Sequence, residues 1–164
     1  MKKIIDFFAV IIISFFGIGF IPNVSGVLTT IISALIFLIL NFPDYIIYSL
    51  IVISILIYIP ANLSQINGIF ENKNINVFPK FIGTFFTLSS PVIYYSIEWI
   101  LVSIFVFTVL SSNRTVFDRY LKTKIKNWSI LIKDLTAGVV AGIVLHVLYA
   151  GWLISPYVLG YLEK

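Results

Sequence analysis

The sequence contains no cysteine and few charged residues. Without cysteine, the chain can form no disulfide bond, no thiolate nucleophile and no Cys-based zinc or iron–sulfur site. Only 11% of the 164 residues are charged, whereas 60% are hydrophobic, and the mean hydropathy is +1.06. These values lie far outside the usage of ordinary globular proteins, so the composition predicts an integral membrane protein.

The length limits the protein to one domain. A helix that crosses a bilayer needs about 20 apolar residues, so 164 residues have room for about four to six such segments. The start of the chain, MKKIIDFFAVIIISFFGIGF, imitates a signal peptide, but no small-x-small cleavage site follows, so we expect it to be retained. We predict an all-α integral membrane protein, a compact bundle of about four to six transmembrane or re-entrant helices in a single membrane-embedded domain, 1–164.

Polar or Gly/Pro-rich breaks divide the apolar residues into runs that we expect to be helices. The break GIGFIPNVSG, residues 17–26, contains three glycines and a proline, which a continuous helix would not favour. The tripeptide SSP, residues 89–91, is expected to split the fourth run into two helices. The predicted runs are 4–20, 27–40, 45–60, 81–110 and 134–159.

A basic connection sets the expected orientation in the membrane. Between 111 and 133 a single acid, Asp118, stands against Arg114, Arg119, Lys122, Lys124, Lys126 and Lys133. Such an excess favours the cytoplasmic side. If the chain turns back at Pro91, the polar loops 17–26 and 60–80 also face the cytoplasm. If instead 4–21 spans and 81–110 crosses once, these two loops lie outside, and both topologies remain open.

Four short motifs carry a family resemblance over nearly the whole chain. They are GIGFIPNVSG, VFPKFIG, VFDRY and LIKDLTAG, and their order and separations resemble those of the bacterial phosphatidylglycerophosphatase A family. That family's pattern runs G-S-G-L-x-P-K-A-P-G-T, then D-E-x-x-G, then F-D, then M-x-D-D-x-x-A-G. The residues that fall on its positions are Gly17, Gly19, Pro22, Gly26, Gly83, Phe117, Asp118, Asp134, Ala137 and Gly138.

The resemblance implies a helical membrane bundle that hydrolyses the phosphate monoester of phosphatidylglycerophosphate to give phosphatidylglycerol. It makes Asp118 and Asp134 the candidate catalytic residues and Mg²⁺ ligands. The glycines Gly17, Gly19 and Gly26 are candidates for a substrate site in which backbone N–H groups face the phosphate. The expected location is the bacterial inner membrane, multi-pass, with the polar loops in the cytoplasm; the expected partner is anionic phospholipid and not nucleic acid.

Several acidic positions of the family pattern are replaced. Pro79 and Lys80 stand where the family has Asp-Glu, and Lys133 stands in place of the first acid of its Asp-Asp pair. Lysines repel a dication but attract anionic headgroups, so Lys80 and Lys133 become candidate substrate-binding residues. Two other functions stay open: a catalytically degraded relative that only binds anionic phospholipid, and a channel or transporter subunit. The lack of further intramembrane charges is evidence against the latter.

Simpler interpretations accompany each candidate. Asp134 could be a charge at the start of a helix, stabilised at the membrane surface by the helix dipole, and Asp118 a solvated loop charge. Gly138 and Gly142 have the spacing of a close helix contact. His146 is expected to be hydrogen-bonded inside the bundle rather than catalytic.

Overall fold

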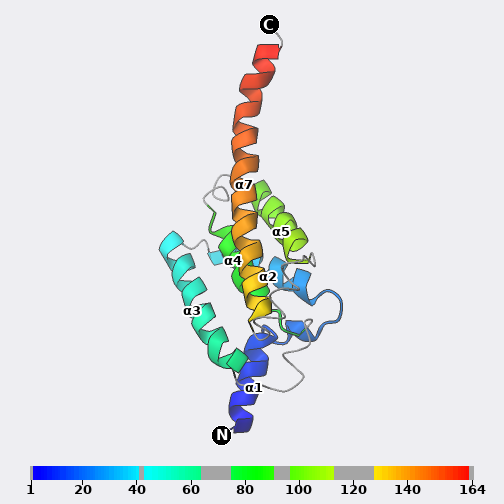
Figure 1. Cartoon of the computed structure of the whole chain (residues 1–164), viewed down its shortest axis with the longest axis vertical. Coiled ribbons are helices and arrows are strands. Elements are labelled where there is room, and N and C mark those ends of the chain that lie inside the picture. The colour runs from blue at the N-terminus through cyan, green and yellow to red at the C-terminus, as the bar shows by residue number, and fades with distance from the viewer. Residues whose placement is uncertain (1, 41–42, 64–74, 91–96, 113–127, 163–164) are drawn as a thin grey trace.

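The structure, a computed structural model, describes residues 2–40, 43–63, 75–90, 97–112 and 128–162. Within these ranges every regular element is a helix and no strand occurs, which confirms the all-α prediction. The elements shown in Figure 1 are α1 (Lys2–Ile13), the 3-10 helix η1 (Ile18–Phe20), α2 (Ser25–Leu40), α3 (Asp44–Leu63), α4 (Phe78–Leu88), α5 (Ile97–Ser112) and α7 (Ser129–Leu162).

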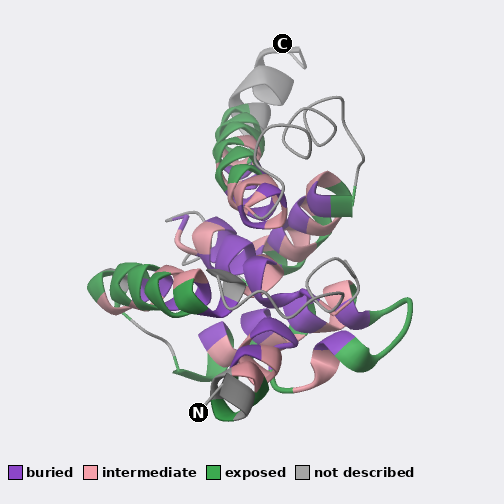
Figure 2. Ribbon diagram, turned by 60° about the horizontal axis from the view of Figure 1, so that its bottom comes forward, coloured by how far each residue is buried: buried purple, intermediate pink, exposed green. Residues whose placement is uncertain are grey.

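Helix α4 lies at the centre of the bundle and contacts α1, α2, α3, α5 and α7 (Figure 1). Most of its residues are buried, as the purple ribbon at the centre of Figure 2 shows. Its threonine hydroxyls therefore need partners inside the protein, and they find them in the helix backbone. Thr84 Oγ1 donates to the carbonyl of Lys80 at 2.7 Å, and Thr87 Oγ1 lies 3.1 Å from that of Gly83.

Helices α4 and α7 run in the same direction and meet at glycines. A Cβ added at Gly83 would collide with the backbone oxygen of Asp134, and a Cβ added at Gly138 would collide with the backbone oxygen of Gly83. Thr87 Oγ1 also lies 3.3 Å from the Gly138 carbonyl, across the same contact. Nothing lies within 4 Å of a Cβ at Gly142, so Gly138 makes the predicted close helix contact but Gly142 does not.

The first apolar run, 4–20, is not one helix. Helix α1 ends at Ile13, and the chain then turns through Phe15, Phe16 and Gly17, all with positive φ. Non-glycine residues rarely adopt this conformation, so packing must hold it in place. Phe15 is buried and its ring stacks on Phe81 of α4, with centroids 4.7 Å apart. A contact between distant segments thus ends the helix earlier than the apolar pattern indicates.

The remaining boundaries follow the sequence more closely. Helix α4 ends at Leu88 and α5 begins at Ile97, which confirms that the 81–110 run contains two helices. Helix α7 begins at Ser129, five residues before the predicted start of the last run. Its segment Ser129–Ile154 is the one described helix that is long and apolar enough to cross a membrane. The multi-pass arrangement remains a prediction, because the other apolar helices are shorter.

Candidate functional site

Asp134 lies inside the bundle and not at its surface. It is in the second turn of α7, and its side chain is only 2% exposed. The helix begins at Ser129, and the contact between Asp134 and Gly83 draws this part of α7 against α4. The interpretation of Asp134 as a surface charge at a helix start is therefore wrong. A buried carboxylate carries a large desolvation cost and needs compensating partners.

Two of the predicted substrate-binding residues, Lys80 and Gly26, are in direct contact. Lys80 is in the first turn of α4, and its Nζ, Cε and Cδ atoms lie against the Cα of Gly26 in the first turn of α2. Any side chain at position 26 would collide with the amine. The backbone hydrogen bonds of α2 begin with the N–H of Leu28, which donates to the Val24 carbonyl at 2.9 Å. The Lys80 ammonium and the first turn of α2 thus form one positively polarised corner.

The charges of Lys80, Asp134 and Lys133 act on one another. Burial lowers the pKa of Lys80 below its ordinary value of 10.5, the negative charge of Asp134 raises it, and the positive charge of Lys133 lowers it further. Opposite charge thus supports the protonated form of Lys80, whereas desolvation and like charge oppose it. The tertiary structure thus brings Lys80 of the second motif close to the neighbouring Lys133 and Asp134 of the fourth.

Two further polar residues lie near this group and were not identified from the sequence. Tyr58 of α3 is fully buried, and Asn76 Nδ2 donates to its hydroxyl at 3.1 Å. The Tyr58 ring stacks on Phe78, with centroids 6.1 Å apart and 8° between the planes. The hydroxyl also lies within electrostatic reach of Asp134. A tyrosine in an apolar run and an asparagine before a helix are too common to predict such a contact.

Gly17 and Gly19 shape the turn between α1 and α2. The Gly17 N–H donates to Ser14 Oγ at 3.0 Å, and the Gly19 N–H donates to the Ser14 carbonyl at 2.8 Å. The Cα of Gly19 also lies against the carbonyl of Ile75, where a Cβ would not fit. Both N–H groups therefore have acceptors within the turn itself.

The described residues around Asp134 do not fit a Mg²⁺ site. Mg²⁺ prefers oxygen ligands in octahedral geometry. The described ranges contain no group of three or more His, Asp or Glu side chains that could hold a metal, and the charged neighbours of Asp134 include the ammonium groups of Lys80 and Lys133. Asp118, the second expected ligand, lies outside the described residues. The paired Asp118–Asp134 site therefore stays a prediction.

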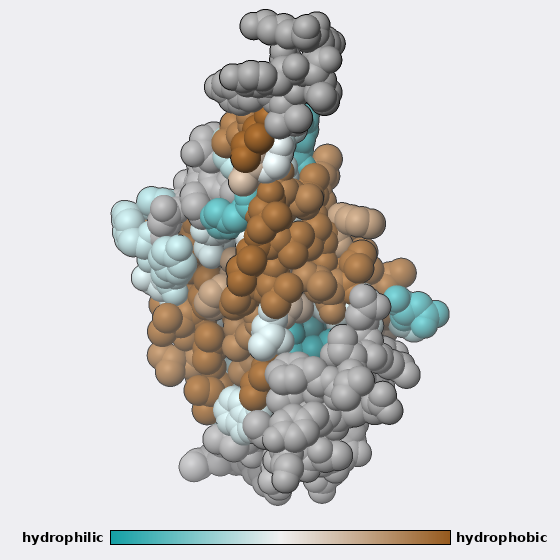
Figure 3. All heavy atoms as spheres, turned by 45° about the horizontal axis from the view of Figure 1, so that its top comes forward, coloured by the Kyte–Doolittle hydropathy of each residue, from teal (hydrophilic) through white to brown (hydrophobic). Residues whose placement is uncertain are grey.

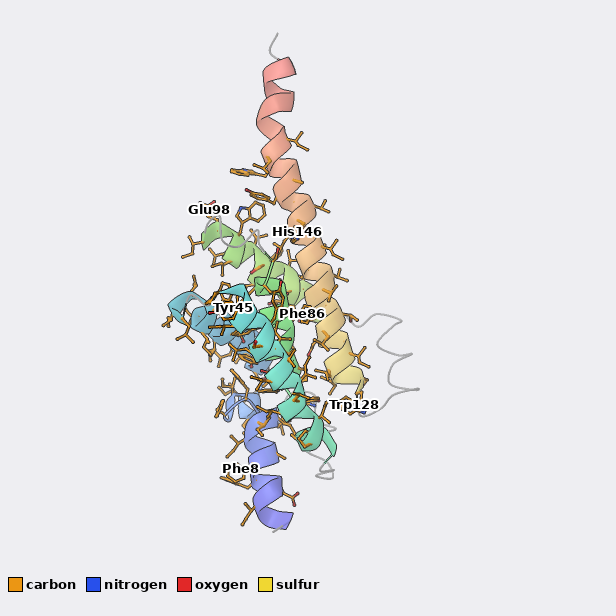
Figure 4. All side chains as sticks on the ribbon, turned by 90° about the vertical axis from the view of Figure 1, so that its left-hand side faces the viewer. Phe8, Tyr45, Phe86, Glu98, Trp128 and His146 are labelled. Atoms are coloured by element: carbon orange, nitrogen blue, oxygen red, sulfur yellow. The ribbon has the colours of Figure 1, made fainter. Side chains whose placement is uncertain are left out.

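His146 is separate from this group. It lies twelve residues beyond Asp134 on α7, about 18 Å along the helix, and Figure 4 shows it well away from Trp128 at the helix start. The residue is exposed, so the expected place inside the bundle is wrong, whereas the expected hydrogen bonding is confirmed. Its Nδ1 lies 2.8 Å from the Gly142 carbonyl and 3.3 Å from Ser90 Oγ. Since a carbonyl can only accept, Nδ1 carries the proton.

A sequence model of the family described as phosphatidylglycerophosphatase A matches residues 11–149, most of the chain. The chain belongs to the phosphatidylglycerophosphatase A family. The resemblance inferred from the four motifs is thereby confirmed, and the matched region contains every site residue predicted from them. No curated protein and no solved structure shows significant similarity to the chain.

Within this family the present chain combines a buried acid from α7 with a lysine from α4 and the first turn of α2. Membership supports a function of the phosphatidylglycerophosphatase type in general.

Proposed function

We propose that this protein is a membrane lipid phosphatase that converts phosphatidylglycerophosphate to phosphatidylglycerol. The proposal is supported by the family match over residues 11–149. It is also supported by the position of Lys80, which lies against the first turn of α2 and within electrostatic reach of the buried Asp134. A phosphate monoester carries two negative charges near neutral pH, and such a corner is suited to hold it.

In this proposal Lys80 and the first turn of α2 bind the phosphate. The ammonium group would donate to phosphate oxygens, and the backbone N–H groups around Gly26 would face the same oxygens. Lys133, half-buried on α7, would add positive charge beside them. Charge-assisted hydrogen bonds of this kind are about twice as strong as neutral ones. Gly17 and Gly19 would contribute by fixing the turn that leads into α2.

The reaction transfers the phosphoryl group to water. Oxygen of water forms a bond to phosphorus, the phosphorus–oxygen ester bond breaks, and the released glycerol oxygen takes up a proton. We assign Asp134 to orient the attacking water and accept its proton, and Asp118 to assist as a second carboxylate. The positive charges of Lys80 and Lys133 would stabilise the charge that develops on the phosphoryl oxygens.

The same proposal places α7 across the bacterial inner membrane. Figure 3 shows a broad apolar face, and exposed apolar side chains follow Asp134 along α7, among them Val139, Val140, Ile143, Val147 and Leu148. Near the far end, Trp99 of α5 packs edge-to-face on Tyr149 and Trp152 of α7. Tyr149 lies about 22 Å along the helix from Asp134, and aromatic residues commonly mark membrane interfaces. Asp134 would then lie near the cytoplasmic interface.

Phosphate release from phosphatidylglycerophosphate in mixed micelles tests the proposal. The purified wild-type chain should release phosphate, and Asp134→Asn should reduce the rate by at least roughly a hundredfold while the circular dichroism spectrum stays helical. Full activity in Asp134→Asn would show that the site is misplaced. If the folded wild-type protein binds the lipid but releases no phosphate, the phosphatase proposal is wrong and the non-enzymatic lipid-binding alternative takes its place.

A further inference from the structure

The carboxylate of Asp134 is buried, so its charge must be compensated within the protein. Its side chain is 2% exposed and lies where α7 packs most closely on α4. A buried carboxylate that stays ionised requires an opposite charge or several hydrogen-bond donors, since water no longer solvates it. In a metal-dependent phosphatase a divalent ion would supply that charge.

In this chain a lysine reaches the same region from α4. The stem and amine of Lys80 lie on the Cα of Gly26, so the absence of a side chain at position 26 makes room for the ammonium. Gly83, three residues after Lys80 on α4, carries the contact with the backbone of Asp134. Residues three apart lie on one face of a helix, so Lys80 and the Asp134 contact share a face of α4.

We propose that the Lys80 ammonium is the built-in cation of this site and stands in for the divalent metal ion that the family resemblance implies. The inference concerns the charge balance around Asp134 and does not depend on whether the protein hydrolyses phosphate. It follows that the site keeps its structure and its affinity for anions without Mg²⁺.

The electrostatics agree with this assignment. Burial lowers the pKa of Lys80 overall, and the charge of Asp134 acts against that shift, as expected for a carboxylate close to the ammonium. Lys133 has the opposite effect on Lys80, so a divalent ion in the same place would be repelled by two ammonium groups. Within the described ranges no cluster of acidic or histidine side chains offsets that repulsion.

The first experiment measures binding of Mn²⁺, a stand-in for Mg²⁺, by electron paramagnetic resonance on the full chain in detergent. The wild-type protein and Lys80→Gln should bind no stoichiometric Mn²⁺, whereas Lys80→Glu should gain one site that is lost again in Lys80→Glu/Asp134→Asn. Stoichiometric binding by the wild-type protein that disappears in Asp134→Asn would overturn the proposal. The wild-type measurement requires no variant to fold.

The second experiment is a double-mutant cycle followed by thermal unfolding. Asp134→Asn should lower the Tm of the wild-type protein by about 2–4 °C more than it lowers the Tm of Lys80→Gln, because only the wild type loses an attraction. The same cycle with Lys133→Gln is the matched control and should give a smaller difference. Equal effects of Asp134→Asn with and without Lys80, or a Tm of the wild type that rises with Mg²⁺ relative to EDTA, would contradict the inference. Neither experiment measures activity, so both can still test the role of Lys80 if the phosphatase assay fails.

Discussion

The Cα of Gly83 lies directly against the backbone carbonyl of Asp134, so α4 and α7 are in backbone contact beside the candidate site. Gly138 makes the reciprocal contact with the carbonyl of Gly83, one turn further along α7. Two such contacts fix both the distance and the register of the helices, because a shift by one residue would bring a side chain into the backbone. The position of Asp134 therefore depends on the absence of side chains at Gly83 and Gly138.

Substitution of either glycine should destabilise the protein. Gly83→Ala and Gly138→Ala each place a methyl group onto a carbonyl, and overpacking of this kind costs about 1–3 kcal/mol. Gly142→Ala, four residues after Gly138 on α7, is the control. A Cβ at Gly142 meets nothing within 4 Å, so this variant should be as stable as the wild type, or more stable by about 0.5–1 kcal/mol because alanine has the higher helix propensity. Chemical denaturation in a fixed detergent measures all three. Equal effects at 138 and 142 would refute the close contact.

Substitution at Gly26 should weaken substrate binding more than it weakens the fold. The atoms that a Cβ would meet belong to the flexible end of Lys80, which can move away. Gly26→Ala should therefore displace the ammonium, remove one charge-assisted hydrogen bond and raise KM for phosphatidylglycerophosphate by about tenfold. The Tm should change by less than it does in Gly83→Ala. A raised Tm with unchanged KM would show that Lys80 does not contact the phosphate.

The pH dependence of stability should reveal the buried lysine. The pKa of Lys80 is lowered in the folded protein, so between that value and 10.5 the unfolded chain binds more protons than the folded one. The free energy of unfolding must then rise with pH across that window. At pH values below the window, the folded protein bears the full cost of burying the charged lysine. The difference between wild type and Lys80→Gln, measured from neutral pH to about 10.5, should show this slope. A slope of opposite sign would mean that the folded protein raises the pKa.

The contact between Tyr58 and Asn76 should contribute to stability. Tyr58→Phe leaves the buried Asn76 amide without this acceptor, at a cost of about 1–2 kcal/mol. Tyr45→Phe provides the control, because Tyr45 is 70% exposed on the same helix and should change stability by less than about 0.5 kcal/mol. Thermal unfolding of the two variants decides the point. Equal effects would show that the Tyr58 hydroxyl is not needed by Asn76.

Cysteine labelling should determine which side of the membrane the polar connections face. Single cysteines at Asn23, Asn72 and Lys124 should all react from the cytoplasmic side, and the chain has no native thiol to interfere. Asn23 is exposed in the turn before α2; the other two positions lie outside the described residues. Labelling of position 23 or 72 from the opposite side would favour the alternative topology, in which these two loops lie outside.

The sequence by itself determined the family, the helical class and several helix ends. Glycine and proline act on the backbone locally, so the break at 17–26 and the split at 89–91 were visible without a structure. The order and spacing of the four motifs identified the family, although several of its acids are replaced in this chain. The replacement of acids by Lys80 and Lys133 was equally plain from the sequence.

Only the tertiary structure decided the surroundings of Asp134. An apolar run indicates that a helix exists but not which face another helix covers, so the burial of Asp134 and the contact of Lys80 with Gly26 could not be predicted. The early end of α1 depends on Phe15 packing against Phe81, a contact between residues far apart in the chain. Gly138 and Gly142 look equivalent in the sequence, and they differ because α4 crosses α7 at one of them and not at the other.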